Sequence, residues 1–257
     1  MKADIILSGV GGQGILSIAA VIGEAALKEG LYMKQAEVHG MSQRGGDVQS
    51  NLRLSDQPIA SDLIPLGQAD LIISLEPMEA LRYLPYLKKD GWLVTNSQPF
   101  INIPNYPEMG NVNEELEKLP HKVVLDVEAI AKEVGSVRAA NIVMLGAAAP
   151  FIGIEYDKIA DGIRRIFGRK GEEIVEMNLK ALKAGKSNKM KKYVFLAFFA
   201  LIAFVVKAQD ESGDLVKEGQ QMPAFTIVND NGTQVPSSSL KRKVILVNFF
   251  ATWCPPC

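Results

Sequence analysis

Residues 5–14 read IILSGVGGQG, an apolar run followed at once by a stretch rich in glycine. From Ile15 to Leu27 the apolar residues then have helical spacing. The first thirty residues therefore predict a buried strand, a glycine loop (Gly9–Gly14) and a helix. Such a loop brings backbone N–H groups to the amino-terminal end of a helix, where they favour an anion.

Strands and helices continue to alternate up to about residue 188. Apolar or alternating runs predict strands at 32–38, 48–54, 70–74, 92–95 and 122–125. Helical spacing predicts helices at 77–87, 129–134 and 139–150 and two closing amphipathic helices at 159–166 and 174–182. This order predicts the α/β class, with a Rossmann-like, doubly wound and mostly parallel sheet. Ligands are then expected at the carboxyl ends of the strands. The acidic residues at strand ends, such as Glu76 and Asp126, are typical of turns or helix caps.

Charge and cysteine content exclude several functions. The 257 residues carry a net charge of −1, so the chain lacks the basic footprint of a nucleic-acid-binding protein. Its two cysteines, Cys254 and Cys257, lie among the last four residues. Residues 1–188 can therefore hold neither a disulfide nor a cysteine-ligated zinc or iron–sulfur site, and no metal site is predicted. Any redox metal used with this part must belong to a partner.

The glycine loop by itself leaves two alternatives open. Gly9, Gly11 and Gly14 satisfy the G-x-G-x-x-G pattern, and Glu37 lies where a ribose-binding acid would be expected. This pattern fits a self-contained NAD(P)- or FAD-dependent oxidoreductase. It also fits a tight turn in a non-catalytic anion-binding or scaffold domain.

A second motif follows the predicted second strand. Residues 37–46 read EVHGMSQRGG and gather an imidazole, a hydroxyl, an amide and a guanidinium among three glycines. Such a loop can bring its backbone close to a ligand or partner and still supply a fixed positive charge. The alternative is a polar surface turn.

Together, residues 8–14 (SGVGGQG) and 37–46 resemble the gamma-type subunit of 2-oxoacid:ferredoxin oxidoreductases, and most closely the small (beta) subunit of indolepyruvate ferredoxin oxidoreductase. The resemblance covers residues 1–188. It implies an enzyme that decarboxylates a 2-oxoacid on thiamine diphosphate, passes electrons through iron–sulfur clusters to ferredoxin and transfers the acyl group to coenzyme A. The large partner subunit would carry the thiamine diphosphate and the clusters, so this chain would be inactive alone.

The resemblance also suggests roles for individual residues. Backbone N–H groups of the glycine loop would bind a phosphate, such as one of coenzyme A, and Gln13 would orient it through its amide. The cofactor-binding residues of this hypothesis are Gly9, Gly11, Gly12, Gln13 and Gly14. In the second motif, Ser42 and Arg44 would face the partner's thiamine site or the ligand's phosphates. His39 could assist with the substrate carboxylate, or be a structural, hydrogen-bonded histidine.

The remaining residues have a different character. Met190 and two lysines precede a 14-residue apolar run at 193–206, which is the pattern of a secretory signal peptide. The run is short for a membrane span, so membrane contact requires that 193–206 insert. The preferred interpretation is that a second protein begins at Met190 and is joined to the first. A buried or peripheral hydrophobic helix is the alternative.

The last fourteen residues, VILVNFFATWCPPC, resemble the first core strand and the redox motif of exported thioredoxin-like thiol–disulfide oxidoreductases. In that family the first cysteine, here Cys254, is the nucleophile and Cys257 its partner. Because the chain stops at Cys257, an incomplete and inactive fragment is expected. The predicted organisation is thus a gamma-type domain at 1–188, a signal-like segment at 190–209 and a thioredoxin-like fragment at 210–257. The first part suits the cytoplasm, whereas the signal-like segment is inconsistent with it.

Overall fold

The computed structural model divides the chain into two compact units, Met1–Phe199 and Ala200–Cys257. It describes residues 1–39, 45–101, 103–187, 224, 226–228, 231 and 233–240. The predicted signal-like segment and the redox motif with Cys254 and Cys257 lie outside these residues. In the part of the chain so described, no helix is both long and apolar enough to cross a membrane.

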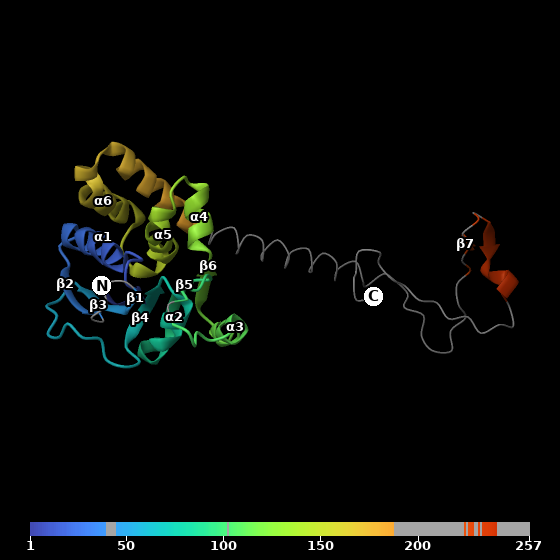
Figure 1. The fold of residues 1–257 in the computed structure, drawn as a ribbon, viewed down its shortest axis with the longest axis horizontal. Helices are drawn as coiled ribbons and strands as arrows, with labels where there is room; N and C mark the ends of the chain where they lie inside the picture. Colours follow the sequence, from blue (N-terminus) through green and yellow to red (C-terminus); the bar gives the residue numbers. More distant parts are fainter. Residues whose placement is uncertain are drawn as a thin grey trace. The chain divides into compact units, whose positions relative to one another are not determined.

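The first unit is built on a six-stranded sheet (Figure 1). Its strands, in spatial order, are β2 (Tyr32–His39), β3 (Asp47–Ser55), β1 (Lys2–Val10), β4 (Ala69–Ser74), β5 (Leu87–Asn96) and β6 (Lys122–Leu125). Strands β1, β4, β5 and β6 pair in parallel, whereas β3 is antiparallel to both β1 and β2. Three of the five strand pairings in this sheet are thus parallel, as expected for a mostly parallel sheet. The sheet is mixed, because β3 is inserted between β1 and β2.

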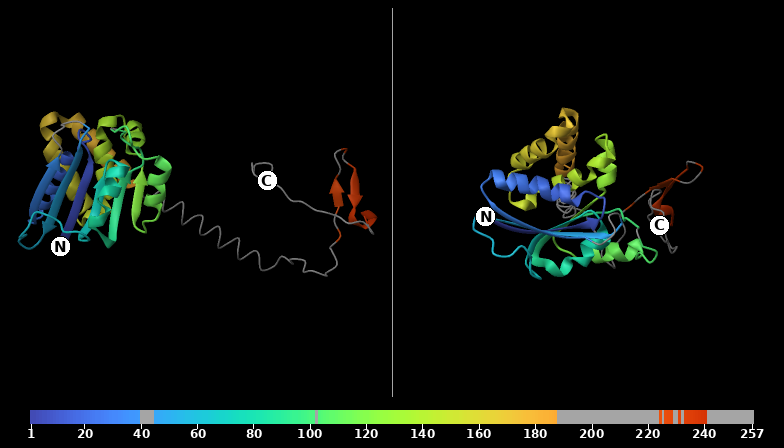
Figure 2. Two further views of the ribbon diagram at one scale, coloured as in Figure 1. Left: turned by 60° about the horizontal axis from the view of Figure 1, so that its bottom comes forward. Right: turned by 60° about the vertical axis from the view of Figure 1, so that its left-hand side comes forward.

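Helices cover both faces of the sheet, as the doubly wound prediction requires (Figures 1 and 2). One face carries α1 (Ile15–Lys28), α4 (Val127–Glu133), α5 (Ala140–Ile152), α6 (Tyr156–Phe167) and a helix at 172–187, and the other carries α2 (Pro77–Arg82) and α3 (Met109–Glu117). The predicted helix at 77–87 ends early, at Arg82. Pro85 follows in a short 3-10 turn, where its missing N–H and its ring oppose a continuing α-helix.

Two apolar cores form on the two faces of the sheet. Residues 3–10 of β1 are all buried because this central strand is covered on both faces, which explains its nearly continuous apolar run. Its odd-numbered residues Ile5 and Leu7 belong to the core under α1 and α5, and Ile6 belongs to the core under α2 and α3. The glycine loop thus follows a central strand of the sheet that is buried on both faces.

The second unit contains a short hairpin among its described residues. Strands β7 (Thr226–Val228) and β8 (Gln234–Pro236) pair antiparallel. Between them the Asn231 side chain accepts a hydrogen bond from the Thr233 N–H at 3.1 Å.

Candidate functional site

The candidate site lies at the carboxyl ends of the parallel strands, where ligands bind in open α/β sheets. The glycine loop leads from β1 into α1, and Leu75 follows β4 directly beside it. The Leu75 N–H donates to the Ser8 carbonyl at 3.0 Å, which ties the end of β4 to the end of β1. Asn96, at the end of β5, donates to the Leu75 carbonyl at 3.4 Å. Three strand ends therefore converge around the glycine loop.

The two sequence motifs are neighbours in the structure. The Gly11 N–H donates to the Gly46 carbonyl at 2.8 Å, and the Gly45 N–H donates to the Gly11 carbonyl at 3.4 Å. These bonds extend the β1–β3 ladder, in which Val10 is opposite Asp47. The insertion of β3 therefore brings the end of the second motif against the glycine loop.

The central residues of the second motif, Ser42 and Arg44 among them, lie outside the described residues. Of His39 the structure describes the backbone, which ends β2 opposite Val48 of β3. The motif thus leaves β2 at His39 and returns at Gly45, beside the glycine loop. The roles proposed for His39, Ser42 and Arg44 remain predictions.

The amide of Gln13, suggested by the sequence as a ligand-orienting group, bonds within the protein. Its Oε1 accepts the Val10 N–H at 2.8 Å and its Nε2 donates to the Leu75 carbonyl at 3.1 Å. The Gly11 N–H is likewise engaged by Gly46. The Gln13 amide and the Gly11 N–H, both predicted to contact the ligand, therefore hold the loop itself instead.

Unlike the Gly11 N–H, the N–H groups of Gly12 and Gly14 have no acceptor among the described residues. Gly14 is the N-cap residue of α1, with φ 86°. No side chain caps this helix start, and the first turn of α1 contains no acidic residue. Uncapped amides at a helix start carry partial positive charge and favour an anion. This part of the loop therefore has the electrostatics expected of a phosphate-binding turn.

Glu37 is not placed to bind a ribose beside this loop. It lies on β2, which β3 separates from β1, so it stands two strand spacings, roughly 10 Å, from the β1 strand. Its exposed carboxylate accepts a hydrogen bond from Gln35 Nε2 at 2.6 Å. The geometry therefore disfavours the dinucleotide-binding alternative.

Two buried acidic residues lie beside the site at the start of α2: Glu76, its N-cap residue, and Glu79 in its first turn. Glu76 caps α2 by accepting the Glu79 N–H at 2.8 Å, as its position in the sequence predicted. It also accepts from the Phe100 N–H at 3.4 Å and from the Tyr106 hydroxyl, and so fastens the segment after β5. Burial raises the pKa of the Glu79 carboxyl, although its ion pair with Arg82 opposes the shift. Burial and the bond to Glu76 raise the pKa of Tyr106.

Sequence reasoning missed Asn141 and Asn96. Asn141, in the first turn of α5, donates from Nδ2 to the Gly14 carbonyl at 3.2 Å. Asn96 is 1% exposed and accepts the Val127 N–H at 3.2 Å, so it joins the end of β5 to the start of α4. The available signal was an asparagine within the otherwise apolar segment 139–150, where a buried amide needs partners.

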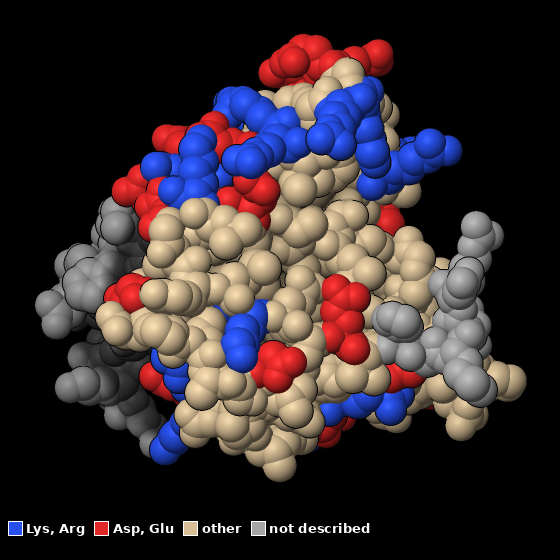
Figure 3. Space-filling view, turned by 90° about the vertical axis from the view of Figure 1, so that its left-hand side faces the viewer, with Lys and Arg blue, Asp and Glu red and all other residues tan. Residues whose placement is uncertain are grey.

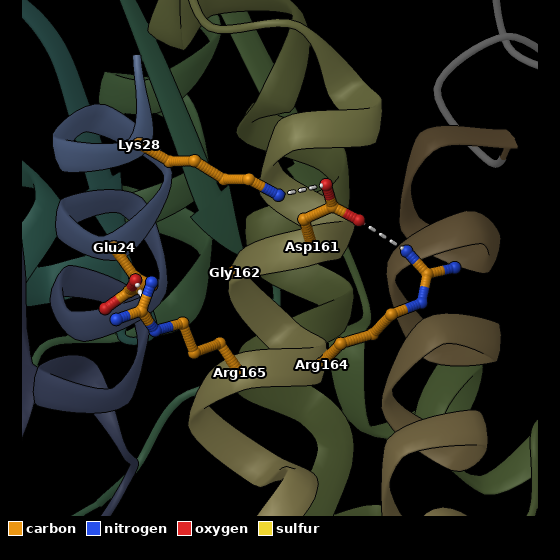
Figure 4. Close-up of a pocket in the computed structure, with 6 residues that line it drawn as sticks. All are labelled: Glu24, Lys28, Asp161, Gly162, Arg164 and Arg165. Carbon is orange, nitrogen blue, oxygen red and sulfur yellow. Dashed lines mark hydrogen bonds and ion pairs between the residues drawn. The ribbon is translucent and has the colours of Figure 1, made fainter. Parts of the chain in front are cut away.

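A separate cavity of about 330 Å³ lies between α1 and α6 (Figure 4) and is lined by Glu24, Lys28, Asp161, Gly162, Arg164 and Arg165. Its charged groups bond to one another: Lys28 and Arg164 to Asp161 at 2.7 and 2.8 Å, and Arg165 to Glu24 at 2.9 Å. Figure 3 shows charges of both signs gathered over α6 and the helix after it. The cavity borders the end of α1, roughly 20 Å from the glycine loop. It is therefore distinct from the candidate site.

Comparison with known proteins identifies two family matches. The family described as pyruvate ferredoxin/flavodoxin oxidoreductase matches residues 4–187, and the family described as Redoxin matches residues 217–257. The subunit IorB of indolepyruvate oxidoreductase from Archaeoglobus fulgidus is 40% identical over 197 residues, which cover 72% of this chain and 94% of the relative. The IorB subunit from Pyrococcus horikoshii is 38% identical, with 71% and 93% covered.

Solved structures support the same assignment. The gamma subunit of keto/oxoacid ferredoxin oxidoreductase from Geobacter sulfurreducens has a TM-score of 0.53 and 27% identity, covering 71% of this chain and 95% of that one. The 2-oxoglutarate:ferredoxin oxidoreductase from Magnetococcus marinus, at 22% identity, shares the fold with a TM-score of 0.57 over 72% of this chain and 30% of its own. The chain therefore belongs to the pyruvate ferredoxin/flavodoxin oxidoreductase family, as a small subunit of a 2-oxoacid:ferredoxin oxidoreductase.

Proposed function

We propose that residues 1–187 form the small subunit of an indolepyruvate-type, that is arylpyruvate-type, ferredoxin oxidoreductase. The observation that carries this proposal is the 40% identity to the Archaeoglobus IorB subunit, of which the chain covers 94%. The common gamma subunit of pyruvate/ketoisovalerate oxidoreductases from Pyrococcus furiosus is only 28% identical. The similarity therefore favours aromatic 2-oxoacids as the substrate class.

In this proposal the enzyme removes the carboxylate of a 2-oxoacid as CO₂, transfers the remaining acyl group to coenzyme A and passes two electrons to ferredoxin. Thiamine diphosphate supplies the decarboxylation chemistry and iron–sulfur clusters carry the electrons, both on the large partner subunit. Residues 1–188 contain no cysteine, in agreement with a subunit that ligates no cluster. Its place of action is the cytoplasm.

The chain's own contribution is to hold coenzyme A and to complete the site with its second motif. The open N–H groups of Gly12 and Gly14 at the start of α1 bind a phosphate of coenzyme A. Arg44 adds a guanidinium, which can bond two phosphate oxygens at once. Ser42 and His39 face the thiamine site or the substrate carboxylate. The contacts of Gly11 and Gly46 support this proposal, because they bring the second motif to the glycine loop.

Reconstitution with a large thiamine and iron–sulfur subunit tests the function. The full chain and the large subunit are co-expressed, and ferredoxin reduction is measured with indolepyruvate, phenylpyruvate, pyruvate and 2-oxoglutarate in the presence of coenzyme A. We expect the complex to use the two aromatic acids preferentially and the chain alone to show no turnover. Ferredoxin reduction by the chain alone, or tight binding of NADH or FAD to it, would instead support a self-contained enzyme.

Replacing Arg44 with alanine tests whether its guanidinium binds the phosphate of coenzyme A. Loss of a charge-assisted bond of about 1.5–3 kcal/mol is expected to raise the KM for coenzyme A roughly ten- to hundredfold in the complex. Steady-state kinetics at saturating 2-oxoacid measures this change. Arg169→Ala is the matched control, because Arg169 is an exposed arginine in the 3-10 turn after α6. An Arg44→Ala complex with unchanged KM and turnover would show that the assigned role is wrong.

We also propose that residues 217–257, which match the Redoxin family, are a thioredoxin-like segment with Cys254 and Cys257 as its dithiol pair. This segment is functionally separate from residues 1–187 and preceded by a signal-like run. Intact-mass spectrometry of the protein from its native source tests whether the two parts are one polypeptide. Two separate polypeptides, one ending before residue 190 and one beginning near it, are expected. A single species that contains both parts would contradict this interpretation.

A further inference from the structure

Side-chain amides from two distant parts of the chain hold the glycine loop. Gln13 folds back over its own loop, so that Oε1 accepts the Val10 N–H at 2.8 Å and Nε2 donates to the Leu75 carbonyl at 3.1 Å. From α5, Asn141 Nδ2 donates to the Gly14 carbonyl at 3.2 Å, across 127 residues of sequence. The loop is thereby fastened to β1, to the end of β4 and to α5.

Two of the loop's glycines make room for these amides. A Cβ at Gly9 would lie 2.8 Å from Gln13 Oε1, and a Cβ at Gly14 would lie 2.6 Å from Asn141 Nδ2. Gly12, with φ +101°, would meet nothing within 4 Å. The first and third glycines of the G-x-G-x-x-G pattern therefore serve contacts inside the protein. Gly12, which is not one of the pattern's glycines, has open space beside it.

We propose that Gln13 and Asn141 are positioning residues, which fix the glycine loop so that the N–H groups of Gly12 and Gly14 are presented to the ligand without contact from either amide. A glycine-rich loop has many accessible backbone conformations, so a single binding geometry must be imposed by bonds from outside it. If that geometry is fixed before binding, less conformational entropy of the loop is lost when the ligand binds. We call the hydrogen bonds of Gln13 and Asn141 to the loop the clamp. The identification of the ligand as coenzyme A rests on the proposed function, whereas the clamp does not.

Isosteric variants that remove only the donor test the clamp. Gln13→Glu and Asn141→Asp replace an N–H donor with a carboxylate oxygen, which repels the carbonyl oxygen of Leu75 or Gly14. Asn178→Asp is the matched control, since this buried amide donates to the Ile174 carbonyl at 2.7 Å in the helix at 172–187. In hydrogen-exchange mass spectrometry of the complex, peptides covering residues 8–16 are expected to exchange about tenfold faster in both loop variants. Exchange equal to that of the control overturns the proposal.

The kinetic readout separates positioning from general stability. In the reconstituted complex, Gln13→Glu and Asn141→Asp are expected to raise the KM for coenzyme A roughly tenfold while kcat stays within about twofold, a loss of binding alone. A merely structural role would lower the amount of active enzyme and leave the KM unchanged. Faster exchange with an unchanged KM keeps the clamp and contradicts coenzyme A at this loop. A raised KM without faster exchange overturns the clamp and keeps the coenzyme A site.

Discussion

Gly146→Ala is expected to destabilise the first unit by roughly 3 kcal/mol, near the upper end of overpacking costs. A Cβ at Gly146 would lie 2.1 Å from the Leu182 carbonyl oxygen of the helix at 172–187, and a Cβ at Gly185 would lie 2.0 Å from the Val143 carbonyl oxygen of α5. The two backbones therefore pack against each other at these glycines. Backbone atoms cannot rotate away as a flexible side chain could, so the helices must separate.

Thermal unfolding measures this effect. A loss of about 3 kcal/mol corresponds to a fall in Tm of roughly 6–12 °C for a unit of this size. The matched control is Gly110→Ala in α3, where a Cβ meets nothing within 4 Å and the helix gains roughly 0.5–1 kcal/mol from reduced backbone freedom. Equal Tm values for the Gly146→Ala and Gly110→Ala proteins would show that the close helix crossing is wrong. Because Asn141 lies in the first turn of α5 and bonds to the glycine loop, activity of the Gly146→Ala complex should also fall.

Asp4→Asn is expected to cost roughly 3 kcal/mol or more at neutral pH, because removing one member of a buried ion pair strands the other. Asp4 is 1% exposed, and Arg53 donates to its two oxygens at 2.7 and 3.2 Å. Arg53 also donates to the carbonyls of Ser61 and Leu63 at 3.0 Å each. The pair thus ties β1, β3 and the segment before β4 together.

The same pair predicts how stability depends on pH. Burial raises the pKa of the Asp4 carboxyl, but the hydrogen bonds and charges of Arg53 and Lys2 outweigh it and hold the pKa below its usual value. A carboxyl whose pKa is lower in the folded state stabilises the protein above its unfolded pKa, about 3.9. That contribution is lost as the pH falls through the folded pKa.

Urea unfolding at neutral pH and at a series of acidic pH values checks both statements. The difference in free energy of unfolding between the native protein and Asp4→Asn should be largest at neutral pH. It should shrink as the solution becomes more acidic than about pH 4. Asp161→Asn is the control, since this surface carboxylate pairs with Lys28 and Arg164 in contact with water and should change stability little. A difference for Asp4→Asn that is constant across the whole pH range would contradict the assigned ion pair.

Residue spacing within the sequence predicted the helices and strands whose bounds depend on their own residues. The first helix was predicted from Ile15 to Leu27 and extends from Ile15 to Lys28, and the strand at 122–125 has the predicted bounds. Both depend on spacing within a few residues, which determines the face that each element buries. The caps at Glu76 and Asp126 were likewise recognisable, because a cap bonds to an N–H three residues away.

Pairing between strands could not be predicted in the same way. The residues of β3 alternate as a strand should, yet nothing in them indicates insertion between β1 and β2 rather than at an edge. This choice depends on contacts between segments that are far apart in the sequence, such as Ile5 with Leu52. It has two consequences for function, since it separates Glu37 from the glycine loop and brings Gly46 to Gly11.

The sequence by itself determined the class of the fold, the two motifs, the absence of cysteine from residues 1–188 and the family they imply. Only the tertiary structure decided what the residues of the glycine loop do. Gln13 bonds to Leu75, 62 residues away, and Gly14 to Asn141, 127 residues away. An amide bonds to whichever acceptor the folded chain brings within about 3 Å, and that distance is set by packing rather than by sequence separation.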